Sequence, residues 1–236
     1  MMKIRYLRKL VLGGVVLGCL VCIGASLAGA ALYPEEVASD KPIAYWRFEK
    51  DLKDSIGGIT LQPSVAPEFV DGPGAGTKAF STKGGNAWAA ALKTVKLFDI
   101  QSFTYEMWIN PAGLNTETYL LMRRTGTSTG TAGENSLVYN YTAGRVEFQS
   151  SHNEFDPRPG FDLTDNTNAW HHVVFVYDDA TMEMIVYLDG KEVDRQPGAI
   201  NYLNTGHDEE IYIGATRTAI GEHIFNGYID EVAIYT

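Results

Sequence analysis

The chain has 236 residues, of which 45% are hydrophobic and 20% are charged, which fits one large folded domain rather than a disordered chain, a collagen or a coiled coil. Its 19 basic residues are outnumbered by 29 acidic ones, a formal net charge of -10. This argues against nucleic acid as a partner, because phosphate binding needs clustered Lys and Arg. The 24 Gly, 13 Tyr and 10 Phe are typical of an all-β protein rich in turns.

The first thirty residues differ from the rest in composition and predict an export segment. A basic stretch, residues 1–9, is followed by an apolar run, residues 10–27, and then by the small-x-small sequence Ala28-Gly29-Ala30. This is the order of a secretory signal, with cleavage expected after Ala30. The apolar run is also close to the minimum length of a membrane-spanning helix, so an uncleaved N-terminal anchor stays open as an alternative.

Removal of this segment changes the chemistry that remains. Both cysteines, Cys19 and Cys22, lie within it, so the mature chain has neither a disulfide framework nor a thiolate. Its four basic residues leave as well, which gives 15 basic against 29 acidic residues and a net charge of -14. The exported protein is therefore more acidic than the whole chain, and this favours cations as partners.

Residues 31–41 form a short lead-in, after which β-branched and aromatic runs cut by Gly, Asp and Asn continue to the end of the chain. About a dozen strands with no helices between them predict antiparallel pairing in a sandwich or barrel that forms one domain over residues 42–236. The expected strands are residues 43–49, 58–61, 78–81, 87–92, 103–110, 119–124, 136–141, 145–150, 170–177, 182–188, 191–195, 210–214 and 225–235.

Turn residues and side-chain alternation add detail to this pattern. Asp189-Gly190 lies between two runs and predicts a tight hairpin, because both central positions of a type I′ turn need positive φ. In residues 103–110 one face is wholly apolar, which predicts a core face, while the other face is mixed. In the last run, residues 225–235, the apolar residues do not all fall on one face of the strand. A bulge near Asp230 would return them to one face.

A set of motifs occurs along these runs in a fixed order. They are residues 45–49 (YWRFE), 103–111 (FTYEMWINP), 170–174 (WHHVV), 186–191 (VYLDGK), 213–214 (IG) and 225–235 (FNGYIDEVAIY). In this order they resemble the laminin G-like domains of the concanavalin A-like lectin/glucanase superfamily. The resemblance implies a concanavalin A-like jelly-roll sandwich of two curved antiparallel sheets. Because lectins, adhesion modules and glucanases share that fold, the function has to be argued from sites.

The resemblance also implies a structural Ca²⁺ at the rim of the sandwich. By position its ligands would be Glu49 from the first strand, with Asp54, the carbonyl of Gly84 or Gly85, and Asp230 from the last strand. Hard oxygen ligands from separate segments suit Ca²⁺, and joining the first strand to the last would close the sandwich. The alternative is that Glu49 and Asp230 only accept hydrogen bonds from the rim backbone.

A carbohydrate-binding groove is the second expected site. Residues 145–150 carry Arg145, Glu147 and Gln149 on one face, and a shared sheet with Glu106 and Trp108 would give an aromatic platform edged by polar groups. Neighbouring strands and the loop of residues 151–168 would add further aromatics, namely Tyr139, Tyr141 and Phe155. The alternative is that these aromatics pack beneath the loop, and for Trp108 core packing is the favoured interpretation.

Catalysis is not expected. Glucanases of the superfamily carry their catalytic carboxylates on one strand in a Glu-x-Asp-x-Glu pattern, which this sequence lacks. Glu106 and Glu147 could face each other across a groove as acid and nucleophile. Isolated glutamates on two strands are more often solvated or paired with Arg, so we predict no catalytic residues and no enzyme activity.

Together these features predict an exported, non-catalytic binding or cell-adhesion module that recognises carbohydrate or an extracellular protein and is stabilised by Ca²⁺. We expect it to be secreted, periplasmic or on the cell surface, and to contact a membrane only through an uncleaved N-terminal segment. A polysaccharide-active glycoside hydrolase or lyase of the same superfamily is one alternative. A structural cell-surface component without a small ligand is another.

Overall fold

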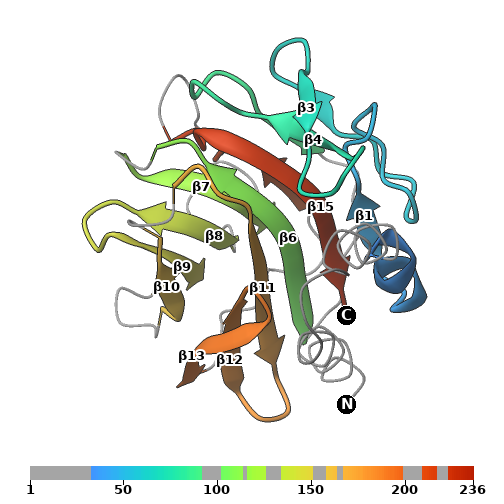
Figure 1. Ribbon diagram of the computed structural model, residues 1–236. Helices are drawn as coiled ribbons and strands as arrows, with labels where there is room; N and C mark the ends of the chain where they lie inside the picture. Colours follow the sequence, from blue (N-terminus) through green and yellow to red (C-terminus); the bar gives the residue numbers. More distant parts are fainter. Residues whose placement is uncertain are drawn as a thin grey trace, which may run out of the picture.

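The computed structural model of the protein describes residues 33–91, 102–113, 116–125, 134–150, 158–163, 167–198, 209–216 and 223–236. These residues form two antiparallel β-sheets, with a short helix at residues 33–39 beside one of them (Figure 1). The predicted all-β sandwich is thereby confirmed. The predicted export segment, residues 1–30, lies outside the described residues, and within those that are described no helix is long and apolar enough to cross a membrane.

The larger sheet has eight strands and contains both the first and the last strand of the chain. Its order is β13-β12-β11-β6-β15-β4-β3, and β1 also pairs with β15. Its strands are β1 (Ala44–Trp46), β3 (Phe69–Asp71), β4 (Lys78–Ser81), β6 (Phe103–Pro111), β11 (His171–Asp178), β12 (Glu183–Leu188), β13 (Lys191–Pro197) and β15 (Gly227–Tyr235).

The smaller sheet has seven strands in the order β10-β9-β8-β7-β14-β5-β2. Its strands are β2 (Gln62–Pro63), β5 (Ala89–Ala91), β7 (Thr118–Thr125), β8 (Glu134–Asn140), β9 (Arg145–Ser150), β10 (Gly160–Asp162) and β14 (Glu209–Ile213). The strand expected at residues 58–61 is wrong, because pairing with β5 begins only at Gln62. The sequence analysis missed β3 and β10, which are three residues long and too short to show alternation.

Aromatic rings fill the space between the two sheets. The inward faces follow the predicted alternation, so that Phe103 of β6, Phe148 of β9 and Phe175 of β11 are all buried in one hydrophobic cluster. Phe148 from the smaller sheet stacks on Phe175 from the larger one, with ring centroids 3.9 Å apart and planes 5° apart. This pair joins the sheets directly.

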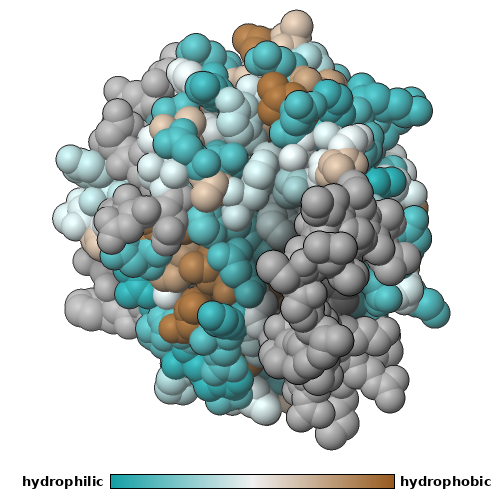
Figure 2. Space-filling model, viewed as in Figure 1, coloured by the Kyte–Doolittle hydropathy of each residue, from teal (hydrophilic) through white to brown (hydrophobic). Residues whose placement is uncertain are grey.

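The surface of the described residues is far more polar than this interior. The face seen in Figure 2 is mostly hydrophilic, with small and separate hydrophobic patches. The exposed large apolar side chains of the described residues are Ile56, Val65, Tyr141, Met182 and Val193, and they belong to separate segments. Most of the apolar surface that folding buries therefore lies between the two sheets.

Two local backbone predictions are confirmed. Asp189 and Gly190 have φ of 49° and 76° and join β12 to β13, as a type I′ turn requires. The β6–β15 register shifts between Asp230 and Ala233, where Glu231 has a φ of 51°, so β15 contains the expected bulge. Before the bulge β15 pairs with β4, and after it with β1.

Truncating the ring that joins the sheets should destabilise the fold strongly. Phe148→Ala removes the stacked ring and leaves a cavity, so we expect a loss of about 3–5 kcal/mol in the free energy of unfolding, measured by urea denaturation. Tyr141→Ala is the control, because Tyr141 is 58% exposed in the turn between β8 and β9, and its loss should change stability little. Equal effects of the two substitutions would contradict this account of the core.

Candidate functional site

The bulge in β15 creates a buried, oxygen-rich corner around Asp230. This residue is 0% exposed, and its Oδ2 has no hydrogen-bond partner among the described residues. The same oxygen lies 2.9 Å from the position that a Cβ on Gly72 would occupy, and Thr77 Oγ1 also borders that position. Only glycine leaves room here for the two oxygens. A buried carboxylate oxygen without a donor is costly, so this corner suits a cation.

Glu49, the other side-chain ligand expected here with Asp230, lies near enough for its charge to act on Asp230. Its Oε2 accepts a hydrogen bond of 3.1 Å from the Lys78 backbone N–H at the start of β4, and its Oε1 accepts one of 3.2 Å from Arg47. Burial, together with the nearby charge of Glu49, raises the pKa of Asp230 to about 9. Without a cation Asp230 is therefore protonated at neutral pH.

The structure does not bring the other predicted metal ligands to this corner. Asp54 Oδ1 accepts hydrogen bonds of 2.9 Å from Tyr45 N–H and 2.8 Å from Ile56 N–H, so it orders the backbone that follows β1. Gly84 lies past the far end of β4, where its N–H donates to Asn226 Oδ1 at 2.8 Å. In the described part of the chain, no group of three or more His, Cys, Asp and Glu side chains could hold a metal ion.

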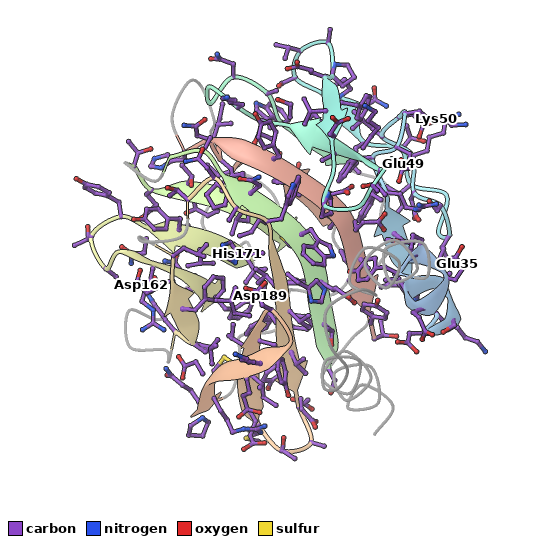
Figure 3. All side chains as sticks on the ribbon, in the orientation of Figure 1. Glu35, Glu49, Lys50, Asp162, His171 and Asp189 are labelled. Atoms are coloured by element: carbon purple, nitrogen blue, oxygen red, sulfur yellow. The ribbon has the colours of Figure 1, made fainter. Side chains whose placement is uncertain are left out.

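A second acidic side chain, Glu231, is buried next to Asp230. Burial, with a contribution from the charge of Glu35, raises the pKa of Glu231 to about 8, and Arg47 Nε donates to its Oε1 at 3.4 Å. Figure 3 shows Glu35 and Glu49 on the same flank of the sandwich. Acidic side chains are thus concentrated where β1, β4, β15 and the helix at residues 33–39 meet, and burial raises the pKa of two of them.

The predicted carbohydrate groove, in contrast, is not formed. Glu106 and Trp108 lie on β6 of the eight-stranded sheet, whereas Glu147 lies on β9 of the seven-stranded sheet. Both glutamates point outward, on opposite sides of the sandwich, because their strand neighbours of opposite alternation fill the core. The alternation predicted each face correctly, but strand order decides which sheet a strand joins, and alternation carries no information about strand order.

The other members of that predicted groove are also separated. Tyr139 points into the core between the sheets, and Tyr141 is exposed in the β8–β9 turn. Phe155 lies outside the described residues. Glu147 Oε1 accepts hydrogen bonds of 2.8 Å from Asn140 Nδ2 and 2.7 Å from Gln149 Nε2. These local donors, with Arg158 Nη1 at 3.4 Å, hold the Glu147 carboxylate in place.

Glu106 is the centre of a buried polar network on the outer face of the eight-stranded sheet. Its Oε1 accepts from Tyr33 OH at 2.8 Å and contacts His172 Nε2 at 2.9 Å, while Oε2 accepts from Tyr235 OH at 2.6 Å. Burial alone would raise the pKa of Glu106. The hydrogen bond and attraction of His172, with the hydrogen bonds from Tyr235 and Tyr33, hold that pKa below its usual value instead.

Beside this network the same sheet presents a row of aromatic side chains: Trp108, which the sequence analysis named but favoured as a core residue, and Trp170 and Tyr228, which it did not name as binding residues. Tyr228 of β15 pairs with Asn110 of β6, and the β6–β11 register brings Trp170 to the other side of Asn110. The Trp170 and Tyr228 rings are 6.3 Å apart, and Trp108 lies two residues along the same face. All three rings are half-buried. We call Trp108, Asn110, Trp170 and Tyr228 the aromatic face.

Polar groups accompany these rings. Asn110 Oδ1 is buried between them and has no hydrogen-bond partner among the described residues. Lys83 Nζ lies 5.9 Å from the centre of the Tyr228 ring. Asp230 pairs with Trp108, so the oxygen-rich corner adjoins the aromatic face. The face therefore combines flat apolar surface with hydrogen-bonding groups. The signal for it in the sequence was the shared alternation of Trp108 and Asn110.

Comparisons with known proteins agree with this architecture. The Laminin_G_3 family model, described as the concanavalin A-like lectin/glucanases superfamily, matches residues 83–236. The chain belongs to this superfamily. The resemblance found in the sequence is thereby confirmed. No curated protein has a significantly similar sequence.

Solved structures of the superfamily fold are similar to this chain. Domain 4 of AbnA, a GH43 extracellular arabinanase from Geobacillus stearothermophilus in complex with arabinotriose, has a TM-score of 0.63 and 22% identity, covering 83% of this chain and 92% of that chain. The receptor binding domain of botulinum neurotoxin mosaic serotype C/D has a TM-score of 0.58 and 15% identity, covering 84% of this chain and 48% of that chain. This chain thus corresponds to about half of the toxin domain. At these identities the likeness shows the jelly-roll fold.

Neutralising Glu106 should destabilise the superfamily domain in a pH-dependent way. Because its pKa is lowered on folding, the ionised carboxylate stabilises the fold above the ordinary value of 4.5, and this contribution is lost as the pH falls through the lowered pKa. We expect Glu106→Gln to cost about 3 kcal/mol at neutral pH and less in acid, measured by denaturation at a series of pH values.

Glu183→Gln is the matched control. Glu183 pairs with Arg195 at the surface, so its loss should cost less than about 1 kcal/mol at every pH. A Glu106→Gln penalty that did not shrink in acid would contradict the assignment of an ionised Glu106.

Proposed function

We propose that this protein is an exported, non-catalytic carbohydrate-binding module of the concanavalin A-like superfamily, and that the aromatic face holds the glycan. The observation that carries the proposal is the row of half-buried Trp108, Trp170 and Tyr228 rings around Asn110. Sugar rings have an apolar face that packs on aromatic rings and a rim of hydroxyls that needs hydrogen-bonding partners. Lys83, which is exposed beside the Tyr228 ring, offers such a partner.

The comparisons support a binding role. The similar arabinanase domain was solved in complex with arabinotriose, and the similar toxin domain is named as a receptor binding domain. An extracellular glycoprotein is a second form in which this chain could meet a glycan. The export segment expected in residues 1–30 agrees with a secreted, periplasmic or cell-surface protein. A purely structural cell-surface role would leave the aromatic face without a function.

Carboxylate geometry favours a non-catalytic module over a hydrolase or lyase. Glycosidases need two carboxyl groups about 5–9.5 Å apart on either side of the scissile bond. Glu106 and Glu147 lie on opposite outer faces, and Glu106 is committed to Tyr33, His172 and Tyr235. Release of reducing ends from a polysaccharide panel, lost on Glu106→Gln, would favour the hydrolase instead.

We further propose that Ca²⁺ stabilises the module at the corner formed by Glu49 and Asp230. The Oδ2 atom of Asp230 is buried without a donor, and Glu49 reaches the same corner from the segment after β1. Backbone and Thr77 oxygens of the β3–β4 hairpin lie around Gly72 and would complete an oxygen site. A bound Ca²⁺ would supply positive charge to the buried Asp230 carboxyl, for which no salt bridge is seen among the described residues, and would link the start of the sandwich to its last strand.

Removing rings from the aromatic face should weaken glycan binding. We expect Trp170→Ala and Tyr228→Ala each to weaken binding about tenfold, because each loses a stacking surface. The measurement is retardation in affinity electrophoresis against polysaccharides identified on a glycan array. Trp88→Ala is the control, since Trp88 is also half-buried but belongs to the seven-stranded sheet side, against Tyr212. Equal losses in all three variants would count against this location.

Calcium should raise the melting temperature of the wild-type protein above its value in chelator. Asp230→Asn and Glu49→Gln should remove this increase, whereas Asp71→Asn should keep it, because Asp71 pairs with Lys78 at the nearby surface. Because Ca²⁺ must displace the proton that Asp230 holds up to a pKa of about 9, the increase should be larger at about pH 8 than at about pH 6. An increase that survives in Asp230→Asn would refute this site.

A further inference from the structure

On the outer face of the eight-stranded sheet Tyr33 lies among Trp108, His172 and Glu106, and we call the position that its side chain occupies the pocket. The phenol ring meets Trp108 edge-on, with centroids 5.9 Å apart and planes at 76°, and it meets His172 edge-on at 5.7 Å and 87°. At the bottom of the pocket the phenol OH donates to Glu106 Oε1 at 2.8 Å and lies 3.1 Å from His172 Nε2. The ring of Tyr33 is thus contacted by other aromatic rings, whereas its hydroxyl is contacted by polar atoms.

The bottom of this pocket is built of two buried polar side chains, an acidic one and a histidine, that a purely structural contact does not need. Glu106 and His172 are 5% and 4% exposed and lie 2.9 Å apart. A buried pair of this kind costs desolvation energy that apolar side chains of the same size would avoid. Tyr235 OH holds the far oxygen of Glu106, so Oε1 keeps a fixed direction towards the incoming hydroxyl. Such preorganised polar groups beneath an aromatic wall are typical of binding sites.

The segment that fills the pocket is weakly built. Its helix spans only residues 33–39, and helices shorter than about 12 residues are marginal on their own. The apolar residues that dock it are Tyr33 and Val37, one turn apart, which pack with Tyr45, Ala233 and Tyr235. In Figure 1 the helix lies beside β1 and the end of β15, outside the sandwich. Local detachment of this segment would leave both sheets intact.

We propose that Glu106, Trp108, His172 and Tyr235 form a binding pocket for a phenolic ring, which Tyr33 occupies in cis and from which it excludes other phenols. The pocket takes an aromatic ring edge-on to Trp108 and His172 and a single hydroxyl on Glu106. Its ligand is a phenol rather than a plain aromatic ring, because the carboxylate needs a donor. The pocket shares Trp108 with the aromatic face, but its hydroxyl site on Glu106 and His172 has no part in the proposed glycan binding, so the phenol test and the glycan test can fail separately.

Emptying the pocket tests this directly. In full-length protein, Tyr33→Ala should bind 4-methylphenol, the analogue of the lost side chain, with a raised melting temperature and a change in tryptophan fluorescence. Wild type should show neither response, because Tyr33 already fills the site. Toluene, which lacks the hydroxyl, should bind Tyr33→Ala at least tenfold more weakly. Absence of 4-methylphenol binding, or equal binding of toluene, would overturn the proposal.

One further variant and one rescue measurement separate a vacated pocket from general loosening. Val37→Ala weakens the same helix but leaves Tyr33 in position, so it should lose stability without gaining affinity for 4-methylphenol. If Tyr33→Ala is unfolded at the assay temperature, 4-methylphenol should restore its folded signal in proportion to concentration. Failure of that rescue, or equal binding by Val37→Ala, would also overturn the proposal.

The source of the phenol can be read from a second probe. In the double variant Tyr33→Ala/Val37→Ala, which vacates both positions, a peptide with the sequence of residues 33–39 should bind more tightly than 4-methylphenol if the pocket is made for a tyrosine on a chain, since Val37 of the peptide adds its own contact. Tighter binding of 4-methylphenol would instead assign the pocket to small phenols. Both results require the phenol pocket, and binding of neither probe refutes it.

Discussion

The bulge in β15 is the constraint on which the rest of this sandwich depends. One edge of β15 serves two strands in succession, β4 up to Ile229 and β1 from Val232 onward. The change of partner leaves Asp230 and Glu231 at the junction, with Glu231 in a left-handed conformation that side chains rarely adopt. Bulges of this kind redirect side chains and interrupt pairing. Here the bulge buries two carboxyl groups, and one oxygen of each, Asp230 Oδ2 and Glu231 Oε2, has no hydrogen-bond partner among the described residues.

The same junction connects the regions of the molecule that carry chemistry. Asp230 pairs with Trp108 across the β6–β15 ladder, and Ala233, just after the bulge, pairs with Glu106. A shift of one residue in β15 would exchange the faces of its side chains. It would then move Tyr228 away from Trp170 and Tyr235 away from Glu106. The aromatic face, the phenol pocket and the oxygen-rich corner are thus three consequences of one register.

Alternation along strands made much of this fold predictable from the sequence. It gave the inward and outward faces of β6 and β9, and its failure in the last run located the bulge near Asp230. Sheet membership was not predictable in this way, because the separation of Glu106 from Glu147 depends on a strand order set by contacts distant in the chain. The family resemblance supplied Glu49 and Asp230, whose approach no local pattern encodes.

The sequence analysis missed two short elements that position site residues, the helix at residues 33–39 and the β3–β4 hairpin. The helix at residues 33–39 is too short for a periodic signal, and packing of Tyr33 on the sheet holds it more than its own propensity does. The β3–β4 hairpin was not predicted, because the glycine-rich sequence around Gly72 is typical of a loop. The absence of a side chain at Gly72 makes room for Asp230 Oδ2 and Thr77 Oγ1.

The oxygen-rich corner and the aromatic face are coupled through a single side chain. The Asp230 side chain points towards the β3–β4 hairpin, while its backbone pairs with that of Trp108. In the absence of a cation, burial keeps this carboxyl protonated, with a pKa of about 9, and one of its oxygens lacks a donor. A cation there would anchor β15 to the hairpin and to Glu49, and the backbone beside Trp108 would gain the same restraint. Rigid placement of an aromatic ring lowers the entropy lost on binding a flat ligand. Metal affinity and ligand affinity would then rise together, by the reciprocity that links any two sites sharing one structural element.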